Sequence, residues 1–154
     1  MKEILLLLAL TIILGCSAQR PNSLGLANSK LSPCPSSPNC VSTQSPKGNH
    51  YIDPIHYTGK KQQAKDAIIS VIRGMKRAQV VTILDDYIHA EFTSAIFRFV
   101  DDVEFYFDDA GKIIHMRSAS RVGYSDFGVN RKRIEEIRSR YNNIVINGST
   151  STAN

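Results

Sequence analysis

The chain has 154 residues and contains no tryptophan, only three cysteines and no apparent internal repeat. The lack of tryptophan argues slightly against a site that stacks on sugar rings. The sequence also lacks G-x-S-x-G, the motif that presents a nucleophilic serine in many hydrolases. Ser118 and Ser120 lie an odd number of positions from His115, so alternation along a strand places each serine on the face opposite the histidine. We therefore assign no catalytic residue from the sequence.

The sequence has no apolar run long enough to span a bilayer. The stretch from Ile4 to Leu14 is only about half of the roughly 20 apolar residues that a membrane helix needs. With Lys2 near the start of the chain, this stretch has the length and position of a signal-peptide core. We expect residues 1–15 to be a signal peptide and not a membrane-spanning anchor.

Residues Ile13-Leu14-Gly15-Cys16 resemble the lipobox of bacterial lipoproteins, where a small residue precedes the cysteine that becomes the lipidated N-terminus. The polar residues after Cys16 agree with this resemblance, and a secreted protein with a chance cysteine is the alternative. Ser17, not an aspartate, follows the cysteine, which favours the outer membrane in lipoprotein sorting. The resemblance implies a protein of the bacterial cell envelope, lipid-anchored through Cys16 on the periplasmic side of the outer membrane.

The formal net charge of the chain is +5. A basic protein can bind nucleic acid, but an envelope location argues against that partner. We expect the membrane itself as one partner, through the lipid anchor. An anionic ligand, an anionic lipid or an envelope protein is the further candidate.

Cys34 and Cys40 are the two cysteines that remain after lipidation, and they lie in a proline-punctuated segment that favours a loop. In an oxidising compartment the expected state is a disulfide, and closing so small a loop stabilises the fold by roughly 2 to 2.5 kcal/mol on the chain-entropy model. A zinc site with His50 and His56 is an alternative with looser spacing than usual zinc motifs, and free or catalytic thiols are another. We assign no metal and no cofactor.

Composition divides the chain into segments. Residues 16–30 are polar, with glycine, asparagine and serine, which is typical of a flexible tether. Residues 31–146 are expected to form one domain, because about 110 residues suffice for a single core. Residues 147–154 are expected to be a disordered tail.

Hydrophobic periodicity predicts two helices and four to five strands. The helices are expected over about residues 60–76, with Thr58 as the cap, and over about 130–142, with Ile134, Ile137 and Tyr141 as the buried seam. Strands are expected over 79–84 and 87–92, then from Phe97 to Phe107 after a bulge or break at 93–95, and over 112–120. Extended pieces are expected over 50–55 and 144–146.

This order of elements predicts an α+β fold with two layers. One layer is an antiparallel β-sheet of four to five strands, and two helices cover one face of it. The other face of the sheet is expected either to be exposed to water or to form a groove.

The densest concentration of arginine, serine and glycine lies between Arg117 and Arg133. If the strand after Glu104 pairs with the strand that holds Arg117 through the turn near Gly111, the acidic start of one lies near the basic end of the other. One interpretation is a structural ion-pair network. The other is an anion site, because arginine offers planar donor forks to phosphate or carboxylate. The candidate residues for either role are Asp101, Asp102, Glu104, Arg117, Ser118, Ser120, Arg121, Asp126, Asn130, Arg131 and Arg133.

The loop from Val122 to Val129 contains Gly123 and Gly128 and leads into the second helix. Glycines beside a helix N-terminus can aim backbone N–H groups at an anion, although the strand-glycine-helix unit of a phosphate loop is missing. Asp126 is expected to cap this loop or to pair with an arginine.

Three motifs together closely resemble the bacterial domain of unknown function family numbered 1499: L-S-P-C-P-S-S-P-N-C-V-S, D-D-V-E-F and R-S-A-S-R-V-G-Y-S-D-F-G-V-N-R-K-R-I. The resemblance spans roughly residues 31–141. The resemblance implies little about activity, since that family has no established biochemical role. The family includes envelope lipoproteins and membrane-associated members. The motif positions it carries over are Cys34, Asn39, Cys40, Asp101, Asp102, Glu104, Arg117, Ser118, Ser120, Arg121, Gly123, Asp126, Gly128, Asn130, Arg131 and Arg133.

Two hypotheses follow from the sequence. The leading one is a non-enzymatic, lipid-anchored envelope protein that binds an anionic ligand, lipid or protein partner through the arginine cluster. The alternative is an enzyme of unassigned class that uses carboxylates of the same cluster, namely Asp102, Glu104 or Asp126. An enzyme predicts these carboxylates exposed in a concave pocket, whereas a structural network predicts them buried and paired.

Overall fold

The computed structural model describes residues 19–151, so the predicted signal peptide and the predicted lipidation site at Cys16 lie outside the described residues. An open antiparallel sheet of six strands forms one layer. Its strands are β1 (Cys40–Ser42), β2 (Ile55–His56), β3 (Ala78–Ile83), β4 (Tyr87–Thr93), β5 (Val100–Asp108) and β6 (Ile113–Ser120). Their order is β1-β6-β5-β4-β3, and β2 also pairs with β6.

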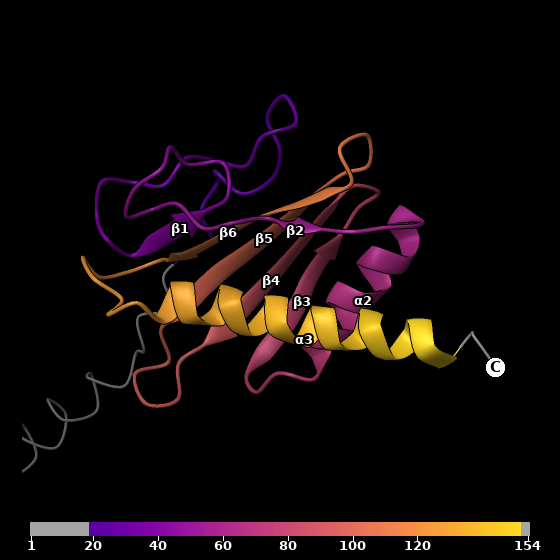
Figure 1. Ribbon diagram of the computed structural model, residues 1–154. Helices are drawn as coiled ribbons and strands as arrows, with labels where there is room; N and C mark the ends of the chain where they lie inside the picture. Colours follow the sequence, from indigo (N-terminus) through magenta and orange to yellow (C-terminus); the bar gives the residue numbers. More distant parts are fainter. Residues whose placement is uncertain (1–18, 152–154) are drawn as a thin grey trace, which may run out of the picture.

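Two helices, α2 (Lys61–Arg73) and α3 (Val129–Ser151), cover one face of the sheet (Figure 1). The predicted α+β fold is therefore confirmed. The sheet has more strands than the four to five expected, because β1 and β2 are too short for alternation of apolar residues to reveal them.

The core lies between the sheet and the helices. Val103, Phe105 and Phe107 of β5 and Ile114 and Met116 of β6 are almost fully buried there, as alternation along each strand requires. The helices contribute the buried residues Ala64, Ala67, Ile68, Val71, Ile72, Ile134, Ile137 and Tyr141. The predicted seam of the second helix is thus confirmed.

The ends of both helices differ from the prediction. α2 begins after Lys60, whose N–H donates to Gln63 Oε1 at 3.3 Å, and not after Thr58. α3 continues to Ser151, so the extended piece predicted at 144–146 is wrong and the helix includes residues expected in a disordered tail from 147. A helix of this length continues once its first turns are packed, because each further residue adds a hydrogen bond.

Lys65 of α2 is a charged residue that is only 5% exposed. Its Nζ donates to the backbone oxygens of Leu84 and Asp85, both at 2.7 Å. The long side chain therefore fixes the turn between β3 and β4 to α2. Lysine can bury its aliphatic stem in this way when its ammonium group finds acceptors.

The break predicted near residues 93–95 is confirmed, because β4 ends at Thr93 and β5 starts at Val100. Phe97 and Phe99 were expected to resume strand alternation but lie in the intervening loop. Their side chains are exposed.

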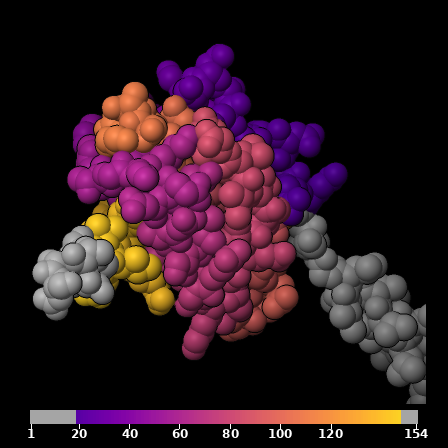
Figure 2. All heavy atoms as spheres, turned by 90° about the vertical axis from the view of Figure 1, so that its right-hand side faces the viewer, coloured from indigo at the N-terminus to yellow at the C-terminus, as the bar shows by residue number. Residues whose placement is uncertain are grey.

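The face of the sheet opposite the helices is partly covered by the N-terminal segment. The N–H of Gly25 donates to Glu104 Oε1 at 2.9 Å, and Arg20 donates to Glu91. In Figure 2 this segment, in indigo, and α3, in yellow, lie on opposite sides of α2 and the strands. From Arg20 onward, therefore, the segment expected as a flexible tether is bonded to the domain. Where this segment lies, the second face of the sheet is covered, and it neither is exposed to water nor forms a groove.

Candidate functional site

Glu104 and Arg117 form a buried ion pair on the sheet face opposite the helices. They are register partners on β5 and β6, and Arg117 Nη1 donates to Glu104 Oε2 at 3.0 Å. Glu104 is fully buried and Arg117 is 7% exposed. The hydroxyl of Tyr87 and the N–H of Gly25 donate to the other carboxylate oxygen at 2.8 and 2.9 Å. Glu104 therefore joins three strands and the N-terminal segment.

Tyr87 is a permanent donor in this cluster. Burial raises the pKa of its hydroxyl well above the ordinary value, and the negative charge of Glu104 raises it further. The hydroxyl stays protonated at neutral pH and keeps its hydrogen bond to the carboxylate.

Arg121 joins two acidic residues on the same face. Its Nε and Nη2 donate to the two carboxylate oxygens of Asp102 at 2.8 and 2.7 Å, the two-pronged geometry that arginine forms best. Nη2 also lies 2.5 Å from Glu91 Oε1. His89 Nε2 lies 2.8 Å from Asp102, and Arg20 Nη2 donates to Glu91 at 2.6 Å. Five side chains thus form one connected network.

The network keeps its carboxylates charged. Burial alone would raise the pKa of Asp102, but the hydrogen bonds from Arg121 and His89 lower it below the ordinary value. Burial likewise opposes the lowering of the Glu91 pKa, which the hydrogen bonds from Arg121 and Arg20 bring about. A carboxyl with a lowered pKa is a poor proton donor at neutral pH.

On the other face of the sheet, Asn130 connects the last strand to the last helix. This residue is fully buried. Its Nδ2 donates to the backbone oxygen of Asn39 at 3.0 Å and to Ser120 Oγ at 2.9 Å, and its Oδ1 accepts from Ser118 Oγ at 2.5 Å. One side chain therefore ties β6, α3 and the segment before β1 together.

Asp126 caps the loop, one of the two roles expected for it, and also the start of α3. Its Oδ1 accepts from the N–H of Gly128 at 2.9 Å, and its Oδ2 accepts from the N–H of Asn130 at 2.8 Å. These bonds satisfy backbone donors that have no partner inside the helix. Through these bonds, Asp126 holds the loop against the first turn of the helix.

Arg133 and Arg131 point to different parts of the protein. Arg133 Nη2 donates to Asp101 Oδ2 at 2.6 Å, and its guanidinium lies 4.8 Å from the ring centre of Phe92. Arg131 Nη2 donates to the backbone oxygens of Asn49 and Tyr51, both at 2.8 Å. Arg131 therefore holds the loop after β1 against α3.

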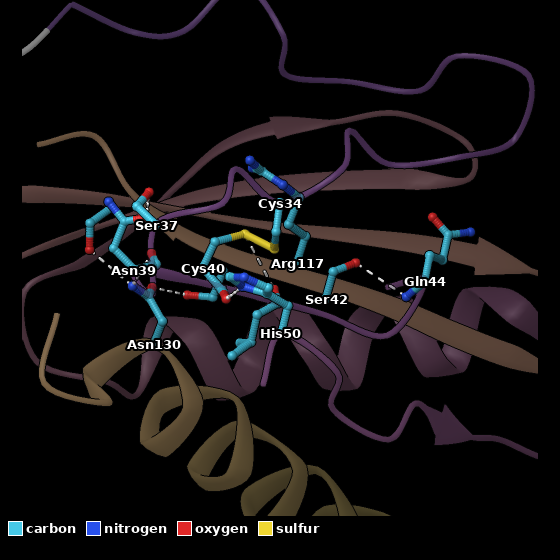
Figure 3. The surroundings of a disulfide bond; sticks show 12 residues. Cys34, Ser37, Asn39, Cys40, Ser42, Gln44, His50, Arg117 and Asn130 are labelled. Carbon is cyan, nitrogen blue, oxygen red and sulfur yellow. Dashed lines mark hydrogen bonds between the residues drawn. A yellow bond between two sulfur atoms is a disulfide. The ribbon is translucent and has the colours of Figure 1, made fainter. Parts of the chain in front are cut away.

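Cys34 and Cys40 form the predicted disulfide, with their Cα atoms 5.6 Å apart. The bond excludes the alternative zinc site, because both sulfurs are used. Figure 3 shows the side chain of Arg117 beside the disulfide. His50 Nδ1 lies 2.9 Å from the backbone oxygen of Cys40. The disulfide thus stands at the edge of the ion-pair network.

The residues predicted as one cluster are divided between the two faces of the sheet. Asp101 and Asp102 are neighbours in sequence and point in opposite directions, as strand alternation demands. The face that carries the N-terminal segment holds Asp102, Glu104, Arg117 and Arg121. The face beside α3 holds Asp101, Ser118, Ser120, Asn130 and Arg133. Asp102 and Glu104 are buried and paired, as the structural interpretation predicted, and not exposed in a concave pocket.

Three ligand-type residues come together within the network. Atoms of His89, Glu91 and Asp102 lie within 4.8 Å of one another. However, both carboxylates accept hydrogen bonds from arginine, whose positive charge opposes a cation at the same place. The arrangement suits an ion pair better than a metal ion.

A basic groove of about 500 Å³ lies between the end of α2, the β4 end and the first turns of α3. The basic residues that line it are Lys76, Arg77, Lys132, Arg133 and Arg140. Its two carboxylates already have partners, since Asp101 pairs with Arg133 and Glu136 pairs with Arg140. Among the described residues, no carboxylate pairs with Lys76, Arg77 or Lys132.

Of the residues that line this groove, only Arg133 and Asp101 were candidates from the sequence. The other basic residues lie far apart in the chain, at the end of one helix and along another. Each looks like an ordinary solvated charge until α2 packs beside α3. The one pattern in the sequence that indicated this groove was the basic run R-K-R, in which Lys132 is exposed.

The comparisons with known proteins identify a family and no function. Residues 30–140 match the model of a family described as "Protein of unknown function (DUF1499)". No curated protein matches the chain. No helix among residues 19–151 is both long and apolar enough to cross a membrane.

Proposed function

Because the chain belongs to the DUF1499 family, to which no activity is assigned, we propose a function from its site: a lipid-anchored protein of the bacterial cell envelope that binds an anionic group in the basic groove. The anchor is supported by the lipobox-like residues Ile13-Leu14-Gly15-Cys16. The groove is supported by its charge.

The observation that carries the binding proposal is the excess of positive charge in the groove. Lys76, Arg77 and Lys132 line it without a carboxylate partner in the part of the chain that the structure describes. Arg117 and Arg121, the first sequence candidates, are neutralised by buried carboxylates. Moving either arginine to a ligand would leave a buried charge unpaired, which costs several kcal/mol. Binding a ligand through Lys76, Arg77 or Lys132 breaks no such ion pair and so carries no such cost.

The lining of the groove also indicates the kind of ligand. Met75, Phe92 and Val129 place apolar surface beside the cations. A phosphate ester with an attached carbon chain matches both features, because its oxygens accept from arginine and lysine while its carbons contact the apolar side chains. A lipid headgroup and a free phosphate ester share this chemistry.

The enzyme alternative has less support. Asp102 and Glu104 have no exposed carboxylate oxygens to offer a substrate, since their residues are 2% and 0% exposed. Asp126 accepts backbone N–H groups as a helix cap.

Binding to two soluble probes tests the proposal. The full chain in detergent is titrated with short-chain phosphatidylglycerol and, separately, with inorganic phosphate. Arg77→Gln and Lys132→Gln are each expected to weaken binding about tenfold, the value of one charge-assisted hydrogen bond. Binding of the lipid alone points to a headgroup, and equal binding of both points to a free phosphate.

Lys60→Gln is the matched control, because Lys60 is an exposed lysine outside the groove, beside the start of α2. It is expected to leave the affinity unchanged, and none of the three variants is expected to lower the melting temperature. If neither probe binds, or if Lys60→Gln weakens binding as much as Lys132→Gln does, the groove is not a specific anion site.

A further inference from the structure

Two loops of the protein expose large apolar side chains. In the β4–β5 loop, Ile96 is 82% exposed and Phe97 is 73% exposed. In the loop between β6 and α3, Tyr124 is 76% exposed and Phe127 is 90% exposed. Isolated apolar residues are common on protein surfaces, but a group of four large ones on neighbouring loops marks an interaction surface.

The two loops lie side by side at one end of the sheet. The N–H of Arg121, where the second loop starts, donates to the oxygen of Val100, where the first loop ends, at 3.2 Å. Ser94 and Val129 of the two loop regions line the same basic groove. Figure 1 shows both loops at the end of the molecule where α3 begins. The four exposed side chains therefore lie on two adjoining loops at the same end of the sheet, and we call these loops with their side chains the loop surface.

The described chain starts at the same end. Glu91 lies two residues before the end of β4, and it accepts from Arg20 and from Arg121. Cys16 precedes Arg20 by four residues, which can span at most about 14 Å. A lipid attached at Cys16 must then enter a bilayer close to the loop surface.

The charge around the loop surface suits an anionic bilayer. Arg98 is exposed in the first loop, and Arg77 and Lys132 line the adjoining groove. Two carboxylates in or beside these loops are engaged inside the protein, Asp101 by Arg133 and Asp126 by the backbone at the start of α3. Cations next to exposed aromatic side chains are the combination by which peripheral proteins bind the membrane interface.

We propose that the loop surface is a second membrane contact, in which Phe97 and Phe127 enter the boundary between lipid headgroups and acyl chains. This inference rests on the proposed lipid anchor at Cys16. The contact sets the orientation of the domain: the strands stand with the β4–β5 loop towards the bilayer and the β3–β4 turn away from it. The basic groove then opens beside the headgroups.

The absence of tryptophan from the chain makes a direct test available. Phe97→Trp, Phe127→Trp and Leu84→Trp each give the full-length protein a single fluorescent reporter. Leu84 is a matched control, since it is 58% exposed and lies in the β3–β4 turn at the other end of the sheet. Each protein is processed in a bacterial host, purified in detergent and reconstituted into vesicles of phosphatidylethanolamine and phosphatidylglycerol, with and without bromine-labelled acyl chains.

The expected result is a blue-shifted emission and quenching by brominated lipid for the reporters at residues 97 and 127, with neither change at residue 84. Equal behaviour of all three reporters, or emission typical of water at residues 97 and 127, would overturn the inference. So would protection of these two reporters only when a soluble envelope protein is added. The mass of the mature N-terminus is measured on the same samples. An unmodified Cys16 refutes the anchor, and a lipidated Cys16 with both loop reporters in water refutes the loop contact alone.

Discussion

Glu104 and Arg117 stand directly opposite each other on β5 and β6 and form an ion pair of 3.0 Å in which the carboxylate is fully buried. Arg117 Nε is itself buried without a hydrogen-bond partner among the described residues. One hydrogen-bond donor of the buried pair therefore has no acceptor among these residues, and each of the two charges is compensated by the other. Because of this mutual compensation, Glu104 and Arg117, which the sequence offered as a binding site, are structural residues.

Glu104→Leu is expected to lower the free energy of unfolding by about 3–5 kcal/mol, because it leaves the guanidinium of Arg117 buried without its carboxylate. The double variant Glu104→Leu, Arg117→Met is expected to recover most of that loss, since well-packed apolar residues often replace a buried ion pair without cost. Urea denaturation of the wild type, of the single variants Glu104→Leu and Arg117→Met, and of the double variant measures both effects. Additive losses in the double variant would show that the two side chains act independently.

Asn130→Ala is expected to lower the free energy of unfolding by about 3 kcal/mol. The substitution leaves the hydroxyls of Ser118 and Ser120 without their amide partner, and each unsatisfied buried group costs about 1–3 kcal/mol. It also removes one of the two donors to the Asn39 oxygen, which keeps its bond from the N–H of Ser120. Asn142→Ala is the control, because Asn142 is exposed on the same helix. Thermal unfolding followed by circular dichroism compares the two. A similar small change in both would mean that the polar junction contributes little.

Replacing both cysteines of the disulfide by serine is expected to lower the free energy of unfolding by about 2 kcal/mol, the chain entropy of so small a loop. A reducing agent should produce the same loss in the wild type and no further loss in the double variant. A reductant effect that persists in the Cys34→Ser, Cys40→Ser protein would have to come from another source.

His115 is expected to make stability depend on pH. Burial lowers the pKa of its imidazole, so the neutral ring is favoured in the folded state. Thr43 Oγ1 accepts from the N–H of Met116, which leaves its hydroxyl proton free to donate to His115 Nδ1, 3.2 Å away. That bond also requires an unprotonated nitrogen.

For such a group the unfolded state binds the proton more tightly. The stabilisation is therefore complete above pH 6.5, the ordinary pKa, and is lost as the pH falls from there through the lower pKa of the folded state. Asp102 and Glu91 act in a separate window, at and below the ordinary carboxyl pKa near 4. In His115→Gln, the free energy of unfolding should change less between pH 7 and 5 than in the wild type. An unchanged slope would assign the dependence to other histidines.

The sequence determined the class of fold and the residues that matter for it. Ile134, Ile137 and Tyr141 recur at helical spacing, and Val103, Phe105 and Phe107 alternate along a strand, so each pattern identifies its own buried face. The short loop between Cys34 and Cys40 likewise contained the information for the disulfide. These features are local, because the residues that decide them lie within a few turns or one strand.

Strand alternation also contained a signal that the motif would divide. Asp101 and Asp102 had to point to opposite sides of the sheet. Neither residue indicated which side would face the helices and which would face the N-terminal segment. Only the tertiary structure decided that Glu104 would be covered by Gly25, 79 residues away, and so be unavailable to a ligand.

The groove and the loop surface were decided at the same level. Lys76, Arg77 and Lys132 become one basic surface only when α2 packs beside α3. The loops that carry Phe97 and Phe127 meet at one end of the sheet only when β5 pairs with β6. Local periodicity can specify helices, strands and their apolar faces, because those depend on backbone geometry. Which exposed side chains meet depends on packing between distant segments. For this protein that packing moved the candidate site from Arg117 in β6 and Arg121 just after it to the groove beside α3.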